Sequence, residues 1–243
     1  METNSVKRLL DILRKVLNVS FKGNVLEVWR EVFDIPRGPE YKERIFFLFF
    51  ELRELVKEAK DDILSLEVNH KLYLRHFQNI EKFLEIEALY KDRWDEFRKA
   101  LLTPITIESL EYCLDVLSRH PSENEIGEDD LLWIKEEVDK LTNDVLEKDI
   151  EPDLKKVIVS LLESIDLAII EYKISGIKSF EKLLEQSIGK IILKENLFKN
   201  EETKKKFSGL FSIIKKINDL IKFAKSLTEL AEPIIKMLPQ ILP

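Results

Sequence analysis

The stretch EDDLLWIKEEVDKLTNDVLEKDIEPDLKKVIVSLLESIDLAIIEYKIS, residues 128–175, decides the fold class. Apolar side chains recur in it at alternating steps of three and four residues, before and after Pro152. This spacing places side chains on one face of an α-helix, and proline is tolerated in a helix's first turn. The stretch therefore predicts two consecutive amphipathic helices. Their apolar positions are Leu131, Ile134, Val138, Leu141 and Val145, then Leu154, Ile158, Leu161, Ile165, Ala168 and Tyr172.

The same periodicity extends over most of the chain, between stretches that stop a helix. Such breaks are Pro36–Pro39, Thr103–Pro104 and Ser175–Gly176. The sequence has only 6 glycines and 8 prolines, too few for the many tight turns of a β-sandwich or barrel. We therefore predict an all-α fold, either a multi-helix bundle or a helical-hairpin array. The other predicted helices begin at Asn4 or Ser5 and at Asn24, cover about 40–66 and 69–102, and begin again at Thr106 and Ile177.

A polar stretch, residues 121–129, is the best candidate for a domain boundary because it holds Pro121, Gly127 and several charged side chains. The predicted organisation is an N-terminal helical subdomain (1–120), this linker (121–129), a helical-hairpin subdomain (130–203) and a C-terminal segment (204–243). No repeat of 20–50 residues is visible, which disfavours a solenoid.

The composition indicates a protein of a reducing compartment. A lone cysteine, Cys113, cannot form an internal disulfide. The N-terminal residues 1–20 carry charges at helical spacing, unlike the apolar core of a signal peptide. No apolar run approaches the roughly 18 residues that a transmembrane helix needs. We therefore expect a cytoplasmic protein, or one held peripherally at the inner face of the membrane.

Residue patterns that carry chemistry are sparse. Glu67 and His70 have the Glu-x-x-His spacing of helical di-iron sites, but those sites need a second such motif and two further glutamates. His76 lies six residues from His70, on another helix face. Cys113 has no histidine one turn away and is expected to be structural. The acidic clusters at 61–62 and 128–130 are typical of helix starts and solvated faces. The prediction is no catalytic residue, no metal site and no cofactor.

One stretch resembles a known group of proteins. The sequence AIIEYKISGIKSFEKLLEQSIG, residues 168–189, is similar to a stretch of uncharacterised bacterial all-helical proteins, in which an aliphatic pair, Tyr, Ile and Gly precede a helix with spaced leucines and a terminal Gly. The resemblance covers about residues 130–192. It implies a bacterial origin and an all-helical fold, and it implies no activity.

Charge is distributed unevenly along the chain. From Lys204 onward there are eight lysines and three acidic residues, a net charge of +5, so residues 1–203 carry −12 of the total of −7. The same segment has an apolar stripe at helical spacing, flanked by lysines, which predicts a basic amphipathic helix. Two interpretations stay open: the helix packs onto the chain's own acidic body, with its lysines in solvent or paired with acidic side chains, or it binds a partner protein or an anionic membrane surface. The predicted binding residues are Leu210, Ile213, Ile214, Lys215, Lys216, Ile217, Leu220, Ile221, Lys222, Ala224 and Lys225.

The function that we expect is that of a non-enzymatic bacterial interaction protein, of which a defence or toxin-type effector is one form. Its acidic helical body would carry or regulate the C-terminal helix. The acidic body argues against nucleic-acid binding, which needs a basic surface. Two alternatives stay open. One is a structural subunit of a homo-oligomer, with the C-terminal helix in its core. The other is a helical metal-dependent enzyme around Glu67 and His70.

Overall fold

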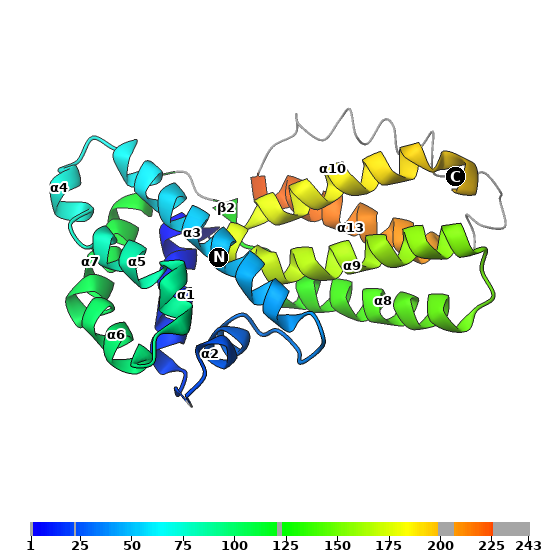
Figure 1. The fold of residues 1–243 in the computed structure, drawn as a ribbon. Helices are drawn as coiled ribbons and strands as arrows, with labels where there is room; N and C mark the ends of the chain where they lie inside the picture. The colour runs from blue at the N-terminus through cyan, green and yellow to red at the C-terminus, as the bar shows by residue number, and fades with distance from the viewer. Residues whose placement is uncertain (1, 22, 121–122, 199–206, 226–243) are drawn as a thin grey trace. The chain divides into compact units, whose positions relative to one another are not determined.

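The computed structural model describes residues 2–21, 23–120, 123–198 and 207–225 (Figure 1). The described chain is all-helical apart from two paired strands of two residues each, β1 (Glu2–Thr3) and β2 (Glu123–Asn124). This confirms the predicted fold class at the level of secondary structure. The chain divides into two compact units. Unit 1 comprises residues 1–2, 123–172 and 177–243, and unit 2 comprises residues 3–122 and 173–176.

Unit 2 is built around α1, whose apolar face packs on α3 and α7. As predicted, Asn4 and Asn24 begin helices, because their side chains accept hydrogen bonds from backbone N–H groups of the first turn. Buried Arg98 covers the other end of α1 by donating to the carbonyls of Val16 and Val19, each at 2.8 Å. The helices of unit 2 are α1 (Ser5–Asn18), α2 (Val25–Val32), α3 (Tyr41–Leu64), α4 (His70–Tyr73), α5 (Phe77–Phe83), the 3-10 helix η1 (Ile86–Tyr90), α6 (Trp94–Leu101) and α7 (Pro104–Leu117).

The prediction of one long helix over residues 69–102 was wrong. The structure forms four short pieces there, α4, α5, η1 and α6. Phe83 and Leu89 lie six residues apart, so a continuous helix would turn them to different faces. The breaks allow both side chains to be buried, at 0% and 4% exposed. Burial of large apolar side chains therefore outweighs the local preference for a straight helix.

Unit 1 contains four long helices that lie side by side and share one hydrophobic core (Figure 1). The hydroxyl of buried Tyr172 accepts a hydrogen bond from the Ile126 N–H at 2.8 Å, and the Tyr172 ring packs on Phe180. Residues 123–129 of the predicted linker thus belong to this unit. Its helices within the described residues are α8 (Glu128–Glu147), α9 (Pro152–Ser175, in this unit as far as Tyr172), α10 (Ile177–Leu193), α11 (Glu195–Phe198) and α13 (Ser208–Lys225).

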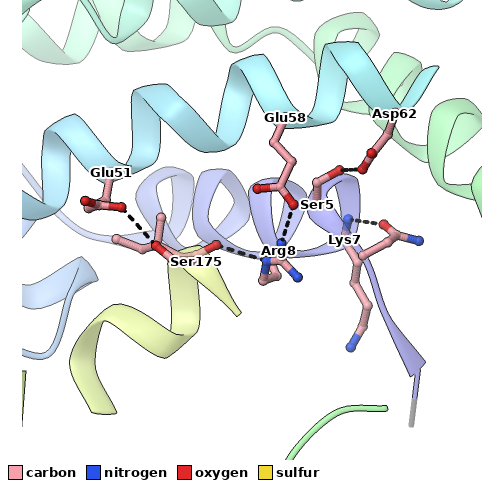
Figure 2. Close-up of polar contacts among 9 residues, drawn as sticks. Ser5, Lys7, Arg8, Glu51, Glu58, Asp62 and Ser175 are labelled. Carbon is pink, nitrogen blue, oxygen red and sulfur yellow. Dashed lines mark hydrogen bonds and ion pairs between the residues drawn. The ribbon is translucent and has the colours of Figure 1, made fainter. Parts of the chain in front are cut away.

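The corner between α9 and α10, residues 173–176, belongs to unit 2 and is held there by side chains from distant parts of the chain (Figure 2). Arg8 donates from Nε to the Ile174 carbonyl at 2.9 Å, and Ser175 donates to Glu51 at 3.1 Å. Gly176 turns the chain with a φ of +60°, a conformation that glycine adopts without strain. Separations of more than 120 residues along the chain explain why the sequence did not reveal these contacts.

Candidate functional site

The candidate site consists of α13 and the faces of α8 and α10 that contact it. We call these two faces, without α13 itself, the α13 seat. The apolar stripe predicted to meet a partner faces the core of unit 1, with every predicted apolar member at most 9% exposed. The structure therefore buries these side chains in the core of unit 1, as expected if the helix packs onto the chain's own body. These residues are Leu210, Ile213, Ile214, Ile217, Leu220, Ile221 and Ala224.

The predicted lysines separate from the stripe. Lys215 is exposed, and Lys216 and Lys222 are each 37% exposed. Lys216 forms an ion pair with Asp130 at the start of α8, at 2.6 Å, and Lys222 lies 3.9 Å from Asp219 on its own helix. The side chain of Lys225 lies outside the described residues. The apolar and basic parts of the predicted surface thus face in different directions, as in an amphipathic helix seated on a core.

Sequence reasoning missed several members of the site. Phe207 and Phe211 are buried beside the stripe, and Asn218 is 4% exposed in its middle. On α8, Leu141 would lie 3.9 Å from a Cβ placed on Gly209. The sequence assigned Asp130, in the acidic cluster at 128–130, to a helix start or a solvated face. The opposite charges of segments 1–203 and 204–243 were the available signal for an Asp130–Lys216 pair, but charge alone does not identify partners.

Cys113 is buried in α7, at 0% exposed, and its thiol donates to the Tyr73 carbonyl at 3.5 Å. Burial raises the pKa of this thiol to about 12. A neutral thiol is a poor nucleophile and a poor metal ligand. The surroundings of Cys113 therefore agree with the structural role expected from the sequence.

The Glu67–His70 motif does not form a helical face. α3 ends at Leu64 and α4 begins at His70, so Glu67 lies in the bend between two helices. The His70 ring pairs instead with the Leu66 carbonyl through Nε2, at 2.8 Å. Asp62, of the acidic pair at 61–62, accepts a hydrogen bond from Ser5 (Figure 2). Across the described residues, no group of three or more His, Cys, Asp or Glu side chains is placed to hold a metal ion.

Two wider observations bear on the site. Among the described helices, none combines the length and the apolar character that crossing a membrane requires. Comparisons with known protein families, curated proteins and solved structures found no match for this chain. The resemblance noted for residues 168–189 thus stays a prediction.

Proposed function

We propose that this chain is a non-enzymatic bacterial interaction protein in which α8, α9, α10 and α13 act as a helical bundle and α13 is the recognition helix. The observation that carries the proposal is the double character of α13. Its apolar side chains fit between two helices, while Lys215 is exposed and Lys216 pairs with Asp130 at the margin of that contact. Recognition of this kind, an amphipathic helix laid on an apolar surface, is a common mode of protein–protein binding.

A partner protein is favoured over an anionic membrane. The seat that α13 occupies combines apolar side chains with a carboxylate at its margin, Asp130, which pairs with Lys216. Another protein with acidic side chains around an apolar surface would offer the same contacts. A lipid surface attracts lysines but provides no shaped apolar surface. The cytoplasmic location expected from the lone cysteine is part of the same proposal.

Severing α13 after folding tests the proposal. A specific protease site replaces residues 200–205, and cleavage then frees a fragment that contains α13 from its covalent link to α10. We expect the fragment to stay bound on gel filtration and to exchange with a labelled peptide of residues 207–225. Loss of the fragment under mild conditions, with no rebinding of the peptide, would contradict recognition by α13.

The Asp130–Lys216 pair provides a matched control. Asp130→Lys should weaken peptide binding about twofold to tenfold, because an exposed ion pair contributes roughly 0.2–1 kcal/mol and the substitution adds repulsion. Asp129→Lys makes the same charge change in the same helix turn, at an exposed position, and should change affinity less than twofold. Vesicles of phosphatidylserine and phosphatidylcholine form a second arm. Salt-sensitive co-sedimentation of the full chain would favour the membrane alternative.

A further inference from the structure

We propose that α13 exchanges between two copies of this chain, so that the α13 of each copy occupies the seat on the other. The inference rests on the proposed function and names the partner as a second copy. Reciprocal exchange of an identical element is a low-cost route to a dimer, because it reuses contacts that already exist within the monomer.

The first argument is the cost of an empty seat. Leu210, Ile217 and the other core residues of α13, together with Phe207 just before it, are at most 9% exposed. If α13 leaves, its apolar face and the faces of α8 and α10 that contact it all meet water, and the unfavourable free energy grows with the apolar area exposed. A partner must therefore return a matching helix as α13 departs. An identical helix from another copy restores every contact.

The second argument is charge. Residues 208–225 carry four lysines and one aspartate, whereas residues 1–203 carry a net charge of −12. Lys216 and Asp130 form the described ion pair between α13 and its seat. Both side chains remain more than one-third exposed, so the pair can form with either copy's Lys216 without burial of an unpaired charge. Attraction between a basic helix and an acidic body acts equally between two copies.

The third argument is the composition of the connection. Residues 199–206 read KNEETKKK, eight consecutive residues without a single apolar side chain. Repositioning this stretch therefore removes no apolar side chain from a core. Fully extended, eight residues span at most about 28 Å. The exchange therefore requires the seat of the other copy to lie within this span of the end of α11.

The test uses two full-length variants with opposite defects. In Asp130→Lys, Lys216 faces a lysine, and in Lys216→Asp, Asp130 faces an aspartate, both in the closed monomer and in each swapped homodimer. A swapped heterodimer of the two variants restores an opposite-charge pair at both seats. The variants carry tags of different mass, are concentrated together near the melting temperature, are cooled, and are then analysed by light scattering and native mass spectrometry.

We expect dimers whose fraction rises with concentration. Random pairing would give the heterodimer and the two homodimers in a ratio of 2:1:1, and we expect the heterodimer to exceed that share several-fold. Replacing Asp130→Lys by Asp129→Lys in the mixture should return that ratio to the statistical value. Monomers at every concentration, or dimers with statistical pairing in both mixtures, would overturn the exchange. If the exchange fails while severed α13 stays bound, the proposed function survives. If severed α13 also dissociates, both proposals fail.

Discussion

At the scale of single residues, Cys113 is a built-in probe of unit 2. Its thiol is buried and has a pKa of about 12, so the reactive thiolate is scarce at neutral pH. We expect Ellman's reagent to leave the native protein unlabelled on the timescale of mixing and to label one thiol per chain in concentrated guanidinium. Cys113→Ala, which has no thiol, is the blank. Rapid labelling of the native chain would show that α7 does not cover this side chain.

Asp34 connects two lysines across a large sequence separation. It accepts hydrogen bonds from Lys15 at 2.8 Å and Lys173 at 2.6 Å, and its backbone has a φ of +56° at the end of α2. Burial raises the pKa of Asp34, but the two lysines outweigh this effect and hold the pKa below its ordinary value. The ionised carboxylate therefore stabilises the folded protein above the ordinary pKa, and this contribution disappears as pH falls through the lowered folded-state pKa.

Asp34→Asn tests this linkage, because asparagine tolerates the left-handed backbone but has no charge. The melting temperature of the variant should fall below that of the wild type at pH 6 to 7. The difference should shrink as pH drops below about 4, where the unfolded carboxyl becomes protonated. A difference that stays constant down to about pH 3 would show that the ion pairs contribute nothing to stability.

At the scale of elements, α10 contains an interior glycine, Gly189, that packs against no other part of the described chain. A glycine inside a helical pattern often has a packing reason, but a Cβ placed on Gly189 meets no atom of the described residues within 4 Å. Gly189→Ala should raise the free energy of unfolding by about 0.5–1 kcal/mol, because alanine loses less backbone entropy on folding. Chemical denaturation measures the change.

Gly176 provides the contrasting control for Gly189. Its φ of +60° is costly for residues with a side chain, so Gly176→Ala should lower the free energy of unfolding by about 1–2 kcal/mol. Equal effects at both glycines would mean that backbone conformation does not distinguish them.

The elements also show what could be predicted from the sequence. The helices with regular three- and four-residue spacing, such as those after Glu128 and Pro152, lie where periodicity placed them. The region 69–102 failed because its aromatic side chains are buried through irregular breaks, which local periodicity does not encode. For α13, periodicity identified the apolar face but not its neighbour. A wide apolar stripe looks the same whether it meets the chain's own core or another molecule.

At the scale of the whole molecule, we expect α13 to contribute strongly to the free energy of unfolding of unit 1. Ile217 is 0% exposed within the shared core, so Ile217→Ala should cost about 2–5 kcal/mol in free energy of unfolding. Lys215 lies on the exposed side of the same helix, so Lys215→Gln should change the free energy of unfolding by less than about 0.5 kcal/mol. Urea denaturation followed by circular dichroism measures both. A small effect at Ile217 would mean that α13 is dispensable, and a binding role without exchange would then become feasible.

The corner at residues 173–176 has a consequence for heredity as well as for folding. Neither unit is a continuous piece of sequence, because unit 2 takes these four residues from the middle of unit 1. A gene fragment encoding residues 3–122 alone would leave out Ile174 and Ser175, the residues that Arg8 and Glu51 contact. Recombination that joined either unit to another protein by a single crossover would separate these partners. The two units are therefore expected to be inherited together and to lack separate histories as portable domains.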